Sequence, residues 1–175
     1  YTCIFGTPTL STVDLRIFHL THFNDCMKCD FCQDSCCQYG ADIEMPRVDT
    51  LLANRTKLEK YLGLPSENWF RTDPEDHGIL EDAEYPGGTY TRTQVSELPP
   101  NRSAHNEYAC VFLDPTPGNR GCRLHRFALE ESIDYQQLKP MVCCLFPVAF
   151  AYGLLGPAYE LELEDELVCQ GPGAT

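Results

Sequence analysis

Basic residues are scarce in this chain. Only 13 of its 175 residues are lysine or arginine, against 26 aspartates and glutamates, which gives a formal net charge of -13 at pH 7. A surface of this sign repels the phosphates of nucleic acids and the head groups of anionic membranes. The charge therefore argues against both as the main partner. It favours a protein partner with a basic surface, or a redox partner, if the charge does more than maintain solubility.

The motifs of common catalytic sites are also missing from the sequence. There is no H-E-x-x-H, no G-x-S-x-G and no glycine loop of the kind that holds phosphate. His125, three residues after Cys122, is the only histidine that we consider for catalysis or metal ligation. A hydrogen-bonded structural role is the more common one for a histidine in such a place.

Cysteine is the residue that the chain has in excess. Eleven is an odd number, so complete disulfide pairing within one chain is impossible. The adjacent cysteines at positions 36 and 37, and at 143 and 144, would also fit a disulfide framework poorly. We therefore expect reduced, metal-ligating cysteines in a reducing cytoplasm or organelle interior. The chain begins at Tyr1 rather than methionine, which leaves room for a targeting segment removed upstream.

The cysteines are concentrated in one segment, residues 26–37, which we call the cysteine cluster. Its C-x-x-C spacings let the backbone turn so that both sulfurs point at one centre, and thiolate suits zinc, copper(I) or iron–sulfur centres. The spacing C-x2-C-x2-C-x3-C matches the bacterial ferredoxin run, although cysteine replaces the proline of that run and no second copy exists. Three short gaps in series favour an iron–sulfur cluster slightly over zinc, which more often uses two separated pairs. The members of the cluster are Cys26, Cys29, Cys32, Cys36 and Cys37.

Single cysteines in three later segments match what a site assembled from distant loops requires. They are Cys110 in the run Cys-Val-Phe-Leu-Asp, Cys122 in Gly-Cys-Arg-Leu-His, and Cys143 in Pro-Met-Val-Cys-Cys-Leu-Phe-Pro. Together with the cysteine cluster, these runs resemble the CxxCxxCC family of zinc- or iron-chelating domain proteins. The resemblance covers residues 26–42 and 108–150, with its separate elements in the family's order.

The resemblance implies metal chelation and a set of metal ligands. The family's cysteines fall on Cys29, Cys32, Cys36, Cys37, Cys110, Cys122 and Cys143, and the spacing argument from the residues adds Cys26. The chain departs from the family in three ways: three residues instead of two precede the cysteine pair, His125 stands where tyrosine is usual, and Cys26 and Cys144 are extra. Seven or eight sulfurs exceed one tetrahedral site. Either two centres exist, or a cluster takes four sulfurs and the others pair or stay free.

We expect one domain over residues 1–175, of the α+β class. It would combine short antiparallel strands, at least one helix and irregular loops pinned by the metal, with the cysteine cluster joined by residues 108–148. A chain of this length buries about 70% of its unfolded surface, so a metal is not needed merely to supply a core.

The pattern of apolar residues predicts several elements. Alternation predicts short strands within residues 10–20 and at 90–95. Leucines at helical spacing predict a helix over residues 49–62, with Asp49 as its N-cap and Gly63 as its stop.

The uncharged stretch from Pro140 to Tyr159 is long enough to span a bilayer. Its prolines and glycines would break a lone helix repeatedly, so we do not expect a membrane span. We expect instead a buried strand, a turn at residues 156–157 and a returning strand, which is the alternating acidic strand over residues 159–164.

Three classes of function are compatible with these observations. The favoured one is a non-enzymatic protein that uses an iron–sulfur cluster or zinc for structure, electron transfer or metal handling. The second is a metal-dependent enzyme, which would need an open coordination position. The third is a secreted interaction domain stapled by disulfides.

Overall fold

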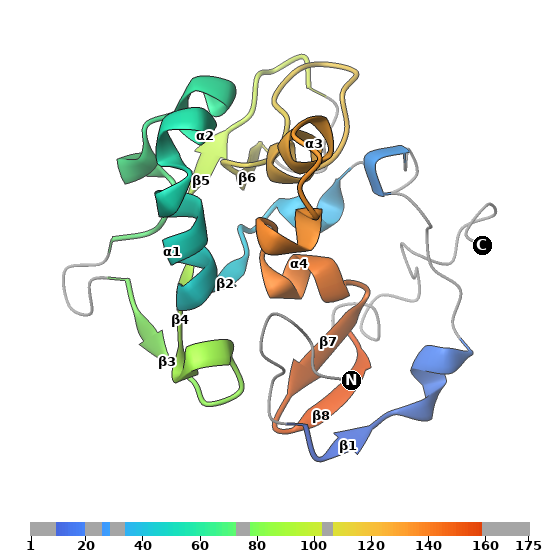
Figure 1. The fold of residues 1–175 in the computed structure, drawn as a ribbon. Helices are drawn as coiled ribbons and strands as arrows, with labels where there is room; N and C mark the ends of the chain where they lie inside the picture. Colours follow the sequence, from blue (N-terminus) through green and yellow to red (C-terminus); the bar gives the residue numbers. More distant parts are fainter. Residues whose placement is uncertain (1–9, 20–25, 29–33, 73–77, 103–106, 159–175) are drawn as a thin grey trace.

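The computed structural model describes residues 10–19, 26–28, 34–72, 78–102 and 107–158 (Figure 1). Within them, short helices and short strands are mixed along the chain, and all strand pairs except one are antiparallel. The predicted α+β class is thereby confirmed.

The elements are short throughout. The α-helices are α1 (Met45–Ala53), α2 (Arg55–Leu62), α3 (Arg123–Glu130) and α4 (Met141–Leu145). The strands are β1 (Thr12–Val13), β2 (Asp42–Glu44), β3 (Leu80–Glu81), β4 (Thr89–Arg92), β5 (Val95–Glu97), β6 (Tyr108–Cys110), β7 (Val148–Ala151) and β8 (Leu154–Pro157). Single 3-10 turns are η1 (Leu15–Phe18), η2 (Cys26–Lys28), η3 (Ser35–Cys37), η4 (Ser66–Asn68), η5 (Pro86–Gly88) and η6 (Tyr135–Gln137).

The described strands form three small sheets. One has the order β2-β4-β3, a second pairs β5 with β6, and the third has the order β1-β8-β7. In the second sheet Val95 lies opposite Cys110, which places that cysteine at the end of β6. Helix α4 contacts both β2 and β7, so it lies between the first and third sheets (Figure 1).

The predicted helix over residues 49–62 is in fact two helices. It begins earlier, after Glu44, so Asp49 lies inside α1 and is not its N-cap. It also breaks at Asn54, whose side-chain amide donates to the carbonyl of Thr50 at 2.9 Å. A side-chain hydrogen bond of this kind competes with the helical backbone bonds. The predicted stop is confirmed, because Gly63 adopts the left-handed conformation (φ 61°) that glycine allows at a helix end.

The main core lies between α1, α2 and α3. Trp69 is completely buried there, with its indole N–H donating to the carbonyl of Leu64 at 3.1 Å. Its ring meets that of Phe112 edge-on, with centroids 5.9 Å apart. Leu51, Leu58 and Leu124 complete the contacts as fully buried side chains. Cys122 belongs to this core, and Cys110 packs against it.

Two of the predicted strands are wrong in extent. The segment 10–20 forms a strand only at Thr12–Val13, because the Asp14 carboxylate then accepts from the amide of Arg16 at 2.9 Å and starts a 3-10 turn. The segment 90–95 belongs to two strands in two sheets, and the break falls at Thr93. Thr93 there accepts from the amide of Ala41 with its hydroxyl oxygen at 2.8 Å.

The uncharged segment after Pro140 starts with a helix, α4, rather than a strand. A strand pair follows as β7 and β8, but the predicted turn residues 156–157 are part of β8, and the turn of the pair lies at Tyr152 and Gly153. Both turn residues have positive φ (53° and 74°), which suits the tight turn of a hairpin. The acidic strand predicted at residues 159–164 lies outside the described residues.

No helix in the described part of the chain combines the length and the apolar character that crossing a bilayer requires.

The two neighbouring leucines of α1 provide a test of the core. Leu51 is 0% exposed and Leu52 is 40% exposed. We expect Leu51→Ala to lower the free energy of unfolding by about 2–5 kcal/mol, because it leaves a cavity in the core. Leu52→Ala should cost about 1 kcal/mol or less, because Leu52 stays 40% exposed and its truncation leaves no enclosed cavity. Urea denaturation of both variants measures the difference, and equal losses would contradict this placement of the core.

Candidate metal centre

A cavity of about 430 Å³ lies where the later cysteine segments meet. Its lining includes five of the predicted metal ligands, which come from four separate parts of the chain. Two are in η3, one ends β6, one directly precedes α3 and one is in α4. They are Cys36, Cys37, Cys110, Cys122 and Cys143.

The other three predicted ligands belong to the first part of the cysteine cluster. Cys29 and Cys32 lie outside the described residues, as does the side chain of Cys26, whose backbone belongs to η2. The six cysteines that the structure describes are free thiols, Cys144 among them. Among the described residues, no three histidine, cysteine, aspartate or glutamate side chains form a group that could hold a metal ion. The described sulfurs thus share one cavity without forming a closed coordination shell.

The two adjacent cysteines of η3 differ in acidity. Their sulfur atoms are 3.9 Å apart. The hydrogen bond with Cys37 lowers the pKa of Cys36, and the positive charge of Lys139 adds to this effect. The same hydrogen bond, together with burial, raises the pKa of Cys37 well above its usual range. In this pair Cys36 is therefore the sulfur that ionises first, with Cys37 as its hydrogen-bond donor.

Burial dominates the acidity of the other two titrating sulfurs in the cavity. It raises the pKa of Cys110 to about 11, although the Thr93 hydroxyl at 3.3 Å and two backbone amides offset part of the effect. Burial also raises the pKa of Cys143 well above its usual range, and the neighbouring sulfurs of Cys110 and Cys122 raise it further. Several thiolates so close together are unfavourable without a cation. A bound metal ion reverses this, because its charge stabilises each thiolate that it touches.

A buried ion pair positions the described end of the cysteine cluster, residues 34–37, against the segment of Cys122. The Asp34 carboxylate accepts from the guanidinium of Arg102 at 2.6 Å and from the amide of Gly121 at 2.8 Å. The Arg102 side chain is 0% exposed, and it also donates to the carbonyl of Asp114 at 3.1 Å. Asp34 therefore ties the turn that precedes Cys36 to the residue that precedes Cys122.

Gly121 also faces the start of the cysteine cluster. It has a φ of 79°, and a Cβ atom at this position would lie 2.5 Å from the sulfur of Met27 in η2. Only glycine fits both the backbone conformation and the contact. Residues on both sides of the undescribed segment 29–33 thus contact the same glycine.

A second buried carboxylate positions α4. Glu44, at the end of β2, is 1% exposed and accepts from the amide of Met141 at 3.1 Å. Its other oxygen accepts from Arg47, also at 3.1 Å. This contact fixes the first residue of the helix that carries Cys143, and so aims that cysteine at the cavity.

The histidine considered for catalysis is not at the cavity. His125 packs its ring on Tyr135 with centroids 4.1 Å apart. Neither of the two described histidines, His19 and His125, is among the residues that line the cavity. The predicted structural role is therefore the better interpretation of His125. Sequence reasoning missed Asp34, Arg102 and Glu44, since an isolated charged residue carries no signal that it will be buried.

No family model matches this chain, and no solved structure matches it. The interpretation of the cavity therefore depends on its own residues.

The ion pair of Asp34 can be tested by removing its charge. We expect Asp34→Asn to lower the free energy of unfolding by about 3–5 kcal/mol, because it removes the negative charge that faces the fully buried guanidinium of Arg102 at 2.6 Å. The matched control is Asp14→Asn, which breaks an aspartate–arginine pair with Arg16 at the same distance, 2.6 Å, but on the surface. That variant should unfold like the parent protein. Similar urea midpoints for the two variants would contradict the role given to Asp34.

Proposed function

We propose that this chain is a cysteine-ligated metal-binding protein. The observation that supports the proposal is the meeting of thiols from η3, β6, the start of α3 and α4 at one cavity. Residues 36 and 143 are far apart in the chain, so their meeting requires the whole fold. Soft thiol donors gathered in this way suit zinc or an iron–sulfur centre better than calcium or magnesium, which prefer oxygen ligands.

The ligands that we propose are the eight cysteines predicted from the sequence. Five line the cavity, and we propose that Cys26, Cys29 and Cys32 complete the set from the cysteine cluster. An iron–sulfur cluster remains slightly favoured because of the spacing within the cluster, and zinc is the alternative. The resemblance to the CxxCxxCC family of zinc- or iron-chelating domains supports the same class of site.

The cavity residues suit such a group chemically. When bound, an iron–sulfur cluster would accept and release single electrons, whereas zinc held by four sulfurs would serve structure. The backbone amides of Phe112 and Leu113 donate hydrogen bonds at the sulfur of Cys110, and the thiol itself donates to the Thr93 hydroxyl oxygen at 3.3 Å. Hydrogen bonds to ligand sulfurs stabilise the thiolate and raise the reduction potential of a cluster. Lys139 adds a positive charge beside Cys36 and Cys143.

The other two classes of function receive different support. A disulfide-stapled secreted domain is disfavoured by the six described free thiols, and we propose a reducing cytoplasm or organelle interior as the compartment. A metal-dependent enzyme is the second candidate, because the cavity leaves space beside the sulfurs for a small molecule. In either case the acidic surface favours a basic or redox protein partner over nucleic acid.

Two adjacent cysteines of α4 allow a matched test of the ligand set. Cys143 lines the cavity, whereas Cys144 is not among the lining residues. The thiol of Cys144 instead donates to the carbonyl oxygen of Lys139, at a sulfur–oxygen distance of 3.6 Å. We expect Cys143→Ser to lose most of the bound metal and Cys144→Ser to keep the metal content of the parent. The measurement is metal and sulfide content, with an absorption spectrum, on protein purified without oxygen.

The parent protein decides between the metals in the same experiment. Iron and sulfide in similar amounts, with broad absorbance near about 400 nm, would indicate a cluster. A colourless protein with zinc would indicate a structural site. A parent without any metal, or two variants with unchanged metal content, would contradict the proposal.

A further inference from the structure

The cavity is larger than a metal site needs to be. Its volume of about 430 Å³ compares with the roughly 10–15 Å³ of cavity volume that one water molecule needs. It falls within the range of pockets that bind small organic molecules, about 300–1,000 Å³. The sulfurs occupy one part of the wall, and the rest is mainly aromatic and aliphatic.

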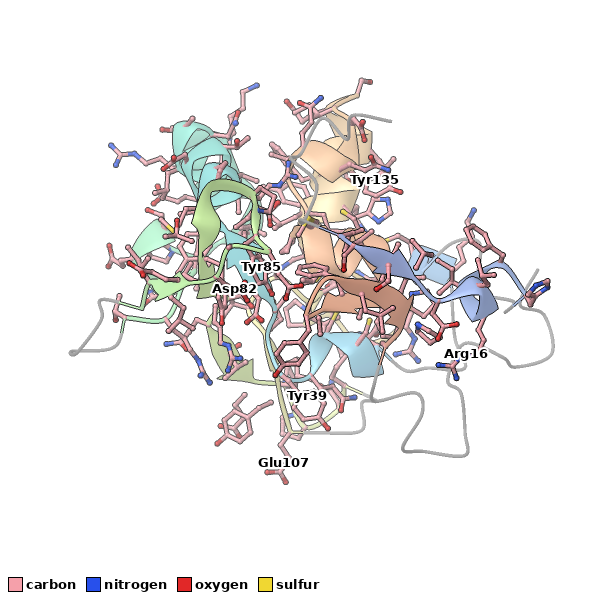
Figure 2. All side chains as sticks on the ribbon, turned by 90° about the horizontal axis from the view of Figure 1, so that it is seen from below. Arg16, Tyr39, Asp82, Tyr85, Glu107 and Tyr135 are labelled. Atoms are coloured by element: carbon pink, nitrogen blue, oxygen red, sulfur yellow. The ribbon has the colours of Figure 1, made fainter. Side chains whose placement is uncertain are left out.

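The aromatic wall is formed before any ligand arrives. The ring of Tyr85 stacks on Tyr90 with centroids 4.3 Å apart, and the ring of Phe150 meets it edge-on at 5.2 Å. Tyr85 and Phe150 both line the cavity, with Val148 and Ala149 beside them. Figure 2 shows Tyr85 near the middle of the molecule. A flat apolar group that enters here would find its contact surface already ordered, which lowers the entropic cost of binding.

One cation is fixed beside this wall. Arg92 donates through Nε to the Asp42 carboxylate at 2.8 Å, and the hydroxyl of Tyr85 donates to the other oxygen of Asp42 at 3.1 Å. Both Asp42 oxygens therefore have donors. The two terminal nitrogens of Arg92 have no hydrogen bond to any described residue, and the side chain is 51% exposed. Held through Nε, the guanidinium can offer its terminal N–H groups to a ligand at the cavity.

Arginine is suited to one kind of ligand group in particular. Its planar guanidinium binds a carboxylate through two parallel hydrogen bonds. A more highly charged group such as a phosphate monoester would be repelled by Asp42 and by the net charge of -13. Lys139 also lines the cavity, but it lies near Cys36 and Cys143, on the side of the sulfurs. Arg92 is therefore the cation that lies near the aromatic wall.

We propose that the cavity binds a small organic monocarboxylate with a flat apolar body. The carboxylate pairs with the terminal nitrogens of Arg92, and the body lies against Tyr85 and Phe150, next to the sulfurs. This site goes beyond the proposed metal centre and does not depend on which metal the sulfurs hold.

The test is a titration of the protein as purified with phenylacetate, benzyl alcohol and phenethylamine, followed by NMR or calorimetry. These molecules share a phenyl body and differ in charge. We expect phenylacetate to bind most tightly, and Arg92→Gln to weaken it by about tenfold or more without changing the affinity for benzyl alcohol.

Arg16→Gln is the matched control, because Arg16 also pairs with an aspartate at the surface but does not line the cavity. Figure 2 shows it at the edge of the molecule, far from Tyr85. This variant should bind phenylacetate like the parent. A second pair of variants blocks the space: Ala149→Trp should abolish binding, whereas Ala151→Trp, at an exposed position of the same strand, should not.

The proposal is overturned if no phenylacetate binding is found, if the amine binds as tightly as the carboxylate, or if Arg92→Gln binds phenylacetate like the parent. Metal content is measured on every sample. A parent that binds phenylacetate without metal would contradict only the metal centre, and a metal-loaded parent that binds none would contradict only the carboxylate site.

Discussion

The buried pair of Asp34 and Arg102 is the constraint on which the site depends. Two charges withdrawn from water are costly unless each is met by a partner, and here the carboxylate meets both the guanidinium and the amide of Gly121. Because separating the two buried charges is costly, the turn before Cys36 is held against the residue before Cys122. Glu44 acts in the same way on α4, through the amide of Met141. Buried carboxylates, rather than apolar packing alone, set the position of the sulfurs.

The electrostatics of the cavity favour the proposed binding of a cation. Burial raises the pKa of Cys110 and Cys143, and neighbouring sulfurs raise the pKa of Cys37 and Cys143 further. Cys37, Cys110 and Cys143 are therefore neutral thiols at pH 7, so binding of the proposed metal by these three would release protons. If the proposed metal binds the folded state more tightly than the unfolded chain, the difference in binding free energy adds to the stability of the core around Trp69, to which Cys122 also belongs.

The sequence predicts some features well because they depend on local chemistry. The α+β class and the helix stop at Gly63 follow from periodicity and from the conformational freedom of glycine. The meeting of cysteines 36, 110, 122 and 143 at one cavity agrees with their expected place in one site, but ligation itself stays a prediction. The break at Asn54 and the split of residues 90–95 between two sheets could not be predicted, because side-chain hydrogen bonds and distant partners decide them. The same holds for Asp34 and Glu44, whose burial follows only from the assembled fold.

We propose that sulfurs from distant segments of the chain bind one metal centre. X-ray absorption at the edge of the metal found in the anaerobically purified protein tests it most directly. The account predicts a first shell of sulfur alone, at about 2.3 Å. A shell dominated by nitrogen or oxygen at about 2.0–2.2 Å would place the metal away from the cysteines and contradict the account.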